Sequence, residues 1–186
     1  MSAGQGSGAW RSVLVTGGVR SGKSTHAERL AAGPDPVVYV APGPVPDAED
    51  PDWAARVAAH RERRPAGWRT VEGHDVAAAV ASAGPATVLL DCLGTWVTAV
   101  VDAAQAWDHP DEELRAVVAG ALEPVLEAVR QHPGRLVVVT NEVGMGIVPE
   151  HRSGRVFRDL LGTANQRVAA VCDEVHLVVA GRVLVL

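Results

Sequence analysis

Eight consecutive residues, 17–24, constrain the fold of this chain more than any other feature. They read GGVRSGKS and match the pattern G-x-x-x-x-G-K-[ST], after an apolar run at 13–16 and before a helix-like stretch at 24–32. Between a strand and a helix, such a glycine-rich turn lets backbone N–H groups surround phosphate oxygens at the positive end of the helix dipole. We therefore predict a phosphate-binding loop made of Gly17, Gly18, Val19, Arg20, Ser21, Gly22, Lys23 and Ser24. The alternative is a glycine-rich turn with a capping serine.

Two residues of this loop have predicted chemical roles of their own. Lys23 is expected to reach the β- and γ-phosphates of a nucleotide, which makes it a candidate catalytic residue. The hydroxyl of Ser24 is expected to bind Mg²⁺.

The rest of the chain alternates short apolar runs with helix-like segments. Strands are predicted at 37–41, 68–72, 87–90, 135–140, 174–180 and 183–186, and helices at 52–62, 74–83, 94–104, 111–131 and 151–171. This alternation predicts an α/β fold with a mostly parallel sheet of about seven strands and helices on both faces. A two-residue turn at Gly181 and Arg182 makes the last strand antiparallel. We expect one domain over 11–186, after a flexible Gly/Ser-rich tail at 1–10.

Composition excludes several classes of protein. With 17 Lys plus Arg against 22 Asp plus Glu, the net charge of −5 disfavours a nucleic-acid partner. The longest apolar runs fall far short of the ~20 residues that span a bilayer, so no stable membrane insertion is expected. Cys92 and Cys172 stand alone, which argues against a zinc site or a disulfide scaffold. Without an apolar leader at the N-terminus, we expect a protein of the reducing cytoplasm.

A carboxylate at the end of the run 88–91, which reads VLLD, is the predicted partner of the phosphate-binding loop. In nucleotide-binding sheets of this kind, an acid at the end of a neighbouring strand holds the Mg²⁺ of the bound nucleotide. Asp91 is therefore a predicted metal-binding and nucleotide-binding residue. The alternative is that Asp91 only caps the helix that follows.

Four arginines cluster around one histidine in an otherwise acidic chain. Arg56, Arg61, Arg63 and Arg64 flank His60. Arginines bind phosphates, often in a bidentate way, and their charge disfavours protonation of a nearby imidazole. The segment is thus a candidate phosphate site with a neutral nucleophile, although a solvated basic helix end would show the same pattern.

Two further segments have a functional and a plain interpretation. Glu72 ends a predicted strand, where it could contact a ribose hydroxyl or a metal-bound water, or be an ordinary strand-end acid. The glycines of 140–149, which reads TNEVGMGIVP, suit close backbone approach to a ligand, a mobile lid or a simple connection. The N-K-x-D motif of regulatory GTPases is absent, which weakens a signalling role.

Several strings together resemble one enzyme family. They are VTGGVRSGKS, RVAAHRERRPAGWRTVE, LLDCL, TNEVGMGIVPEHR, FRDLLGTANQRVA and DEVHLVVAG, in this order after residue 12. They closely resemble the bifunctional adenosylcobinamide kinase/adenosylcobinamide-phosphate guanylyltransferases of cobalamin biosynthesis. The resemblance implies phosphorylation of the aminopropanol hydroxyl of adenosylcobinamide with ATP or GTP. It also implies transfer of GMP from GTP to that phosphate, through a GMP–histidine intermediate.

The resemblance also implies a RecA-like P-loop NTPase fold, a homotrimer and a set of site residues. His60 is the implied catalytic residue that carries GMP. The implied nucleotide-binding residues outside the P-loop are Ala41, Pro42, Gly43, Arg61, Glu62, Arg63, Arg64, Glu72 and Asp91. Two departures are visible: Ala59 precedes His60 where some members have a second histidine, and the Pro42–Gly43–Pro44 stretch lacks the usual hydroxyl.

Two other functions remain open at this point. A single-activity P-loop kinase for a small molecule would phosphorylate its substrate without forming a covalent nucleotide, and His60 would be incidental. A non-catalytic nucleotide-gated module would bind nucleotide without turnover, which the intact Lys23, Ser24 and Asp91 disfavour. His26, inside the P-loop helix, and the remaining histidines are expected to be surface or packing residues.

Overall fold

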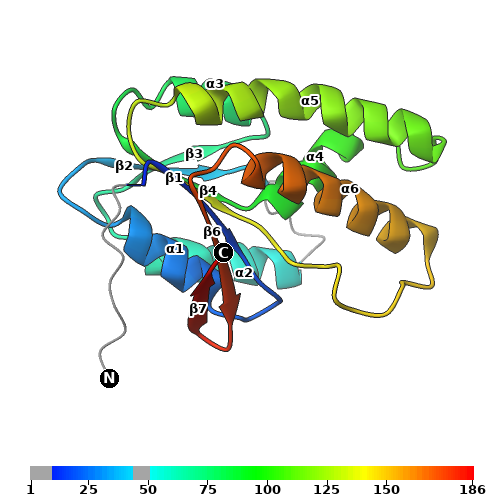
Figure 1. Cartoon of the computed structure of the whole chain (residues 1–186), viewed down its shortest axis with the longest axis horizontal. Helices are drawn as coiled ribbons and strands as arrows, with labels where there is room; N and C mark the ends of the chain where they lie inside the picture. The colour runs from blue at the N-terminus through cyan, green and yellow to red at the C-terminus, as the bar shows by residue number, and fades with distance from the viewer. Residues whose placement is uncertain (1–9, 44–50) are drawn as a thin grey trace.

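A seven-stranded sheet with the order β3-β2-β4-β5-β1-β6-β7 forms the centre of the molecule (Figure 1). The computed structural model describes residues 10–43 and 51–186, apart from the side chains of 52, 53, 56 and 63. The strands are β1 (Ser12–Thr16), β2 (Val37–Ala41), β3 (Arg69–Glu72), β4 (Thr87–Asp91), β5 (Leu136–Val139), β6 (Glu174–Val179) and β7 (Arg182–Val185). The helices are α1 (Lys23–Ala31), α2 (Pro51–Arg63), α3 (Val76–Ala81), α4 (Leu93–Ala103), α5 (Asp111–Gln131) and α6 (Arg152–Ala169).

The predicted fold class is confirmed. Strands β1 to β6 pair in parallel, and β7 pairs with β6 in the antiparallel direction. Most element bounds lie within one or two residues of the predicted ones. Helix α2 begins at Pro51, one residue before its predicted start at 52. Proline suits the first position of a helix, where its missing N–H has no partner to lose. Residues 44–50, between β2 and α2, lie outside the described residues.

Helices cover both faces of the sheet, and the strands alternate their side chains between the two layers. Val13 and Val15 of β1 pack with Ala27 of α1, whereas Leu14 belongs to the core formed with α3, α4, α5 and α6. Strands buried on both faces are apolar at successive positions, which explains the continuous apolar runs in the sequence. Figure 1 shows the four helices above the sheet and α1 below it.

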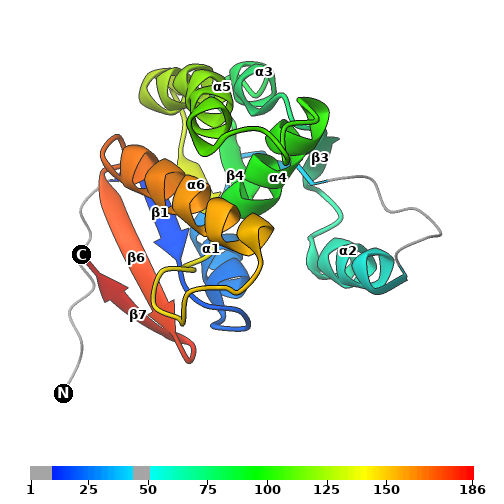
Figure 2. The same cartoon turned by 90° about the vertical axis from the view of Figure 1, so that its right-hand side faces the viewer.

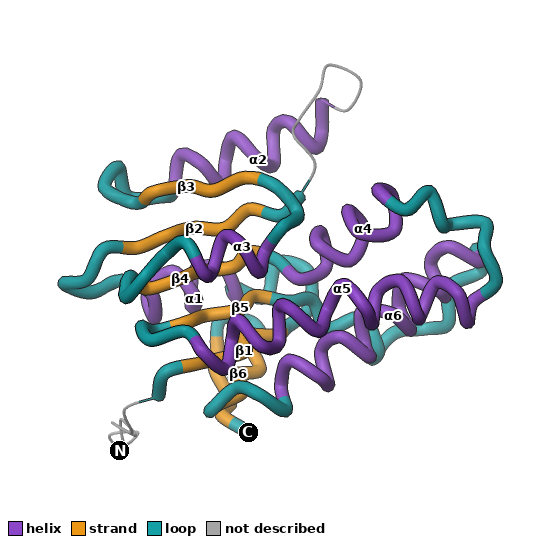
Figure 3. The backbone as a smooth tube through the Cα atoms, turned by 90° about the horizontal axis from the view of Figure 1, so that it is seen from above, coloured by secondary structure: helices purple, strands orange, loops and turns teal. Residues whose placement is uncertain are grey.

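Helix α2 lies at the margin of this body. Of the expected tail at 1–10, only Trp10 is described, and the guanidinium of Arg135 lies 4.1 Å from its ring centroid. Figures 2 and 3 show α2 beyond the β3 edge of the sheet, apart from the layer formed by α3 to α6. Among the described helices, none combines the length and apolarity needed to cross a membrane.

Parallel pairing places the carboxyl ends of β1 to β6 along one edge. In the observed register, Val15 lies beside Val139, Val139 beside Asp91, and Ala41 beside Glu72. The P-loop after β1 is therefore two strands from Asp91, and Glu72 is two strands from Asp91 on the other side. At about 4.8 Å between strands, each interval is roughly 10 Å.

A chain of two histidines and one glutamate ties the P-loop helix to β6. Nε2 of His26 lies 2.9 Å from Nδ1 of His176, and Nε2 of His176 lies 2.9 Å from Oε2 of Glu174. In the neutral tautomer of His176 that donates from Nε2 to the carboxylate, Nδ1 accepts a hydrogen bond from His26. Burial, followed by the charges of His176 and Arg29, lowers the pKa of His26. The predicted structural role of His26 is thus a hydrogen bond between α1 and β6.

This lowered pKa predicts a pH-dependent stability. Below the ordinary histidine pKa of about 6.5, the unfolded chain binds a proton that His26 in the folded chain resists, so stability falls as the pH drops. His26→Gln retains a hydrogen-bond donor but cannot be protonated, and should therefore lose less stability between pH 7 and pH 5. Thermal unfolding across this range, with the exposed His74→Gln as a control, measures the effect. An equal loss in wild type and His26→Gln would contradict the assignment.

Candidate functional site

Two glycines of the P-loop, Gly17 and Gly22, occupy positions that disfavour a side chain. A Cβ on Gly17 would lie 2.4 Å from the carbonyl oxygen of Val178 and 2.7 Å from Oγ of Ser21. Gly22 has a φ of 96°, in the left-handed region that L residues rarely adopt. The tip of the β6–β7 hairpin supports the loop, because the N–H of Gly181 donates to the carbonyl of Ser21 at 2.8 Å.

The loop offers polar groups suited to an anionic ligand. Nζ of Lys23 reaches back over the loop and donates to the carbonyl of Gly18 at 3.2 Å. Within the described part of the chain, the hydroxyl oxygens of Thr16 and Ser21 are buried without a hydrogen-bond partner. Buried hydroxyls are normally hydrogen-bonded, so these two are suited to bind a polar ligand. The residues fit a bound nucleotide phosphate and its cation.

Asp91 lies at the edge of the sheet as predicted, and its side chain is held by a tyrosine. Its side chain is only 7% exposed, and Oδ2 accepts a hydrogen bond from the hydroxyl of Tyr39 at 3.0 Å. Burial and the charge of Asp91 raise the pKa of Tyr39 far above its usual range. Tyr39 therefore stays protonated and orients the carboxylate, which leaves Oδ1 available for a metal ion or its water.

Sequence reasoning missed Tyr39, although one signal was present. It is the only tyrosine of the chain and stands inside the fully apolar run of β2. A buried tyrosine hydroxyl normally finds a partner, so an acid on a neighbouring strand was to be expected.

His60 lies beside Asp91, and the two arginines whose side chains are described lie against the strands. Nδ1 of His60 is 3.7 Å from Oδ2 of Asp91, and the histidine side chain is 37% exposed. Arg61 follows His60 in α2, so its side chain projects about 100° further around the helix. There its guanidinium forms an ion pair with the carboxylate of Glu72. The guanidinium of Arg64 lies 3.6 Å from the ring centroid of Tyr39. The side chains of Arg56 and Arg63 lie outside the described part, so the predicted four-arginine cluster is described only for these two members.

The remaining predicted nucleotide-binding residues differ in how close they lie to the edge formed by the carboxyl ends of the parallel strands. Ala41 ends β2 and lies beside Glu72 of β3. Its carbonyl accepts a hydrogen bond from the N–H of Gly73 at 3.2 Å. Pro42 and Gly43 follow directly after it. Glu62 on α2 and Val19 and Arg20 at the P-loop tip are exposed.

The loop between β5 and α6 lies directly against the P-loop. The N–H of Glu142 donates to the carbonyl of Gly17 at 3.1 Å, and Oε1 of Glu142 accepts from the N–H of Gly144 at 2.5 Å. Asn165 of α6 fixes the start of this loop, because it accepts from Thr140 at 2.6 Å and donates to the carbonyl of Asn141 at 3.1 Å. The backbone of this loop, which was expected to approach a ligand closely, therefore approaches the P-loop itself. Glu142 follows β5, the strand that lies between β4, which ends in Asp91, and β1, which leads into the P-loop.

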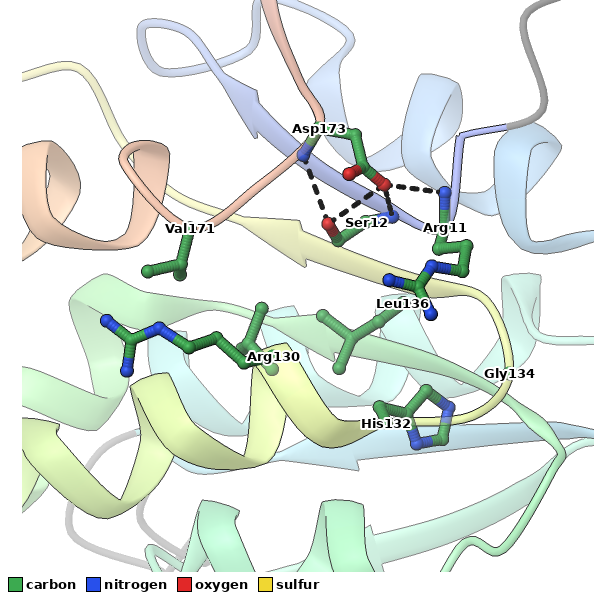
Figure 4. Close-up of a pocket in the computed structure, with 9 residues that line it drawn as sticks. Arg11, Ser12, Arg130, His132, Gly134, Leu136, Val171 and Asp173 are labelled. Carbon is green, nitrogen blue, oxygen red and sulfur yellow. Dashed lines mark hydrogen bonds between the residues drawn. The ribbon is translucent and has the colours of Figure 1, made fainter.

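A crevice of about 150 Å³ opens at the opposite ends of the strands (Figure 4). There Oδ2 of Asp173 accepts hydrogen bonds from the N–H groups of Arg11 and Ser12, at 2.7 Å and 2.8 Å. These bonds lower the pKa of Asp173. This carboxylate fastens the start of β1 to the segment before β6, so the crevice is separate from the P-loop edge.

The Tyr39–Asp91 hydrogen bond predicts a metal-dependent phenotype. Tyr39→Phe removes a donor to a charged group, which should cost about 1–2 kcal/mol of stability and raise the Mg²⁺ concentration required for half-maximal turnover. A Mg²⁺ titration measures this, and Trp68→Phe, which alters only a ring 6.5 Å from Tyr39, is the matched control. Identical titrations for Tyr39→Phe and wild type would show that Asp91 does not depend on the tyrosine.

Comparison with solved structures supports the fold. An ATPase from the type III secretion system of pathogenic bacteria superposes with a TM-score of 0.57 and 15% identity, covering 90% of this chain and 50% of that chain. A protein of Pyrococcus horikoshii OT3 gives a TM-score of 0.51 at 9% identity, covering 94% of this chain and 85% of that one. At these identities the likeness concerns the fold alone.

Comparison of sequences is more specific. The family model described as "Cobinamide kinase / cobinamide phosphate guanyltransferase" matches residues 13–186. The bifunctional adenosylcobalamin biosynthesis protein CobU of Salmonella typhimurium is 43% identical over 91% of this chain and 96% of its own length. The corresponding protein CobP of Pseudomonas aeruginosa is 39% identical over 90% of this chain and 92% of its own. The chain therefore belongs to the cobinamide kinase/cobinamide phosphate guanylyltransferase family, as the sequence motifs predicted.

Proposed function

We propose that this protein phosphorylates adenosylcobinamide with ATP or GTP, and then transfers GMP from GTP to the resulting phosphate through a GMP adduct on His60. The observation that carries the proposal is the position of His60 beside Asp91, on the edge of the sheet that also carries the P-loop. Family membership supports both activities in one chain.

In the kinase step, the acceptor hydroxyl attacks the γ-phosphorus, the bond to the β-phosphate oxygen breaks, and the nucleoside diphosphate leaves. The P-loop N–H groups and Lys23 hold the phosphates in line and stabilise the developing charge. Ser24 and Asp91 are the residues that would hold Mg²⁺, because hydroxyl and carboxylate oxygens are its preferred protein ligands. When bound, that ion supplies neutralisation of the phosphate charge.

In the guanylyl step, a ring nitrogen of His60 attacks the α-phosphorus of GTP and pyrophosphate leaves. Nδ1 faces the Asp91 carboxylate, so a proton on Nδ1 leaves the lone pair of Nε2 for the attack. The phosphate of the phosphorylated acceptor then attacks the same phosphorus and the P–N bond breaks. We assign further contacts with the nucleotide to Arg61, Arg64 and Glu72, at the outer part of this edge. Ala41, Pro42 and Gly43, at the end of β2, complete the proposed set.

A pair of variants separates the two activities. His60→Ala should reduce guanylyl transfer by at least about a thousandfold, because the covalent carrier is lost. Phosphorylation should persist at least in part, because the γ-phosphoryl group passes directly to the hydroxyl. Lys23→Ala is the matched comparison and should abolish both activities, since both use one triphosphate site.

Steady-state assays of each half-reaction measure this pattern. Guanylyl transfer that survives in His60→Ala would show that His60 does not carry GMP. Kinase activity without any guanylyl transfer in the wild-type protein would leave a single-activity kinase with an incidental histidine. Near-normal kinase activity in Lys23→Ala would refute the shared site.

We also propose that the protein assembles as a homotrimer. The resemblance motivates this number, and the exposed edge strand β7 supports self-association. Val183, Leu184 and Val185 on β7 are 41%, 57% and 57% exposed, beside an outer strand edge that has no partner strand within the described chain. Sedimentation velocity should show a trimer, and a stable, active monomer at working concentration would refute it.

A further inference from the structure

The loop between β5 and α6 holds the carboxylate of Glu142 in a defined position. Oε1 of Glu142 accepts a hydrogen bond from the N–H of Gly144 at 2.5 Å. A Cβ on Gly144 would lie 2.8 Å from the same oxygen, so a glycine at this position leaves the carboxylate room to fold back on the loop. Within the described part of the chain, no donor binds the second oxygen, Oε2. A carboxylate held by one oxygen still has the other to accept a proton or a hydrogen bond.

The backbone on both sides of this carboxylate is tied to α6. Asn165 binds the two residues that precede Glu142, through the hydroxyl of one and the carbonyl of the other. The guanidinium of Arg158 donates to the carbonyl of Gly146 at 3.0 Å and also to the carbonyl of Gly144. The loop therefore holds its carboxylate in place before any substrate binds, which is what an acid or base in a reaction requires.

The same carboxylate lies next to the predicted phosphate end of the P-loop. The N–H of Glu142 donates to the carbonyl of Gly17, and Nζ of Lys23 donates to the carbonyl of Gly18, the next residue along the loop. Figure 2 shows the loop after β5 at the end of the sheet where the P-loop lies. Because Lys23 is the residue assigned to the β- and γ-phosphates, Glu142 lies beside the place where the γ-phosphate is transferred.

The other acids that end parallel strands at this edge are already engaged. Oδ2 of Asp91 is held by the hydroxyl of Tyr39, and Asp91 is the residue assigned to Mg²⁺. Glu72 forms an ion pair with Arg61. Glu142 has no ion pair with a Lys, Arg or His side chain within the residues that the structure describes. Of these three acids, Glu142 is thus the one with an oxygen still available to an acceptor hydroxyl.

We propose that Glu142 is the general base of the kinase step. This inference rests on the proposed function. Oε2 takes the proton of the acceptor hydroxyl while the hydroxyl oxygen bonds to the γ-phosphorus. The bond from that phosphorus to the bridging oxygen breaks, and the nucleoside diphosphate leaves with the electron pair. Glu142 is half-buried, so it returns the proton to water after each turnover.

The guanylyl step does not need this base. The ring nitrogen of His60 attacks the α-phosphorus with its own lone pair, and the phosphate of the acceptor then attacks as an anion. Neither attack removes a proton from a hydroxyl. Loss of the Glu142 carboxylate should therefore slow one half-reaction and spare the other, whereas damage to the shared P-loop should slow both.

The test begins with Glu142→Gln, which keeps an oxygen for the N–H of Gly144 but is not basic. Its kcat for phosphorylation of adenosylcobinamide should fall at least about a hundredfold, the usual contribution of a positioned base. Formation of the GMP adduct from GTP and Mg²⁺, without any corrinoid, should proceed at the wild-type rate. Glu150→Gln is the matched control, because Glu150 is an exposed acid of the same loop, and it should keep both rates.

Chemical rescue separates a base from a residue that only shapes the loop. In Glu142→Ala, added formate supplies a small carboxylate and should restore at least about tenfold of the lost kinase rate, whereas chloride at equal ionic strength should not. Kinase activity of Glu142→Gln within threefold of wild type would overturn the proposal. A parallel loss of adduct formation, or a kinase rate that formate leaves unchanged, would also overturn it. Absence of kinase activity in the wild-type protein would instead refute the proposed function.

Discussion

Parallel pairing of β1 with β5 and β6 is the constraint on which the rest of the structure depends. It buries β1 on both faces, so that the chain must leave the sheet at Gly17 through a turn too tight for any side chain. It also brings the ends of β4 and β5 to the same edge, which places Asp91 and Glu142 in line with the P-loop. The helix α1 then begins at Lys23, with its N-terminus at the phosphate site.

Much of this arrangement could be predicted from the sequence because it depends on local patterns. The P-loop needs glycines at fixed spacing between a strand and a helix, and Asp91 ends an apolar run whose position in a parallel sheet follows from its alternation with helices. The hydrogen bonds that orient these groups could not be predicted in the same way. Tyr39 and Asp91 are 52 residues apart, and Asn165 holds Thr140 from 25 residues away, so their contacts depend on the strand order and the packing of α6.

The arginines around His60 show a limit of another kind. The sequence places them together, but a helix turns successive side chains in different directions. Arg61 reaches Glu72 and Arg64 covers the ring of Tyr39, while His60 lies near Asp91. Asp91 thus lies between the nucleotide site and the proposed nucleophile, and one carboxylate can serve both half-reactions. The P-loop lies two strands away. In the proposed mechanism the two reactions use separate nucleotide molecules, one attacked at its γ-phosphorus and the other at its α-phosphorus.

The central claim is that His60 becomes covalently linked to GMP, and peptide mapping after incubation with GTP and Mg²⁺ tests it most directly. Mass spectrometry of the wild-type protein, without any corrinoid, should place one GMP on the peptide that contains His60. The linkage should be labile in acid and stable in base, as a phosphoramidate is. A GMP adduct on any other residue, or a protein that stays unmodified while it turns over GTP, would contradict the account.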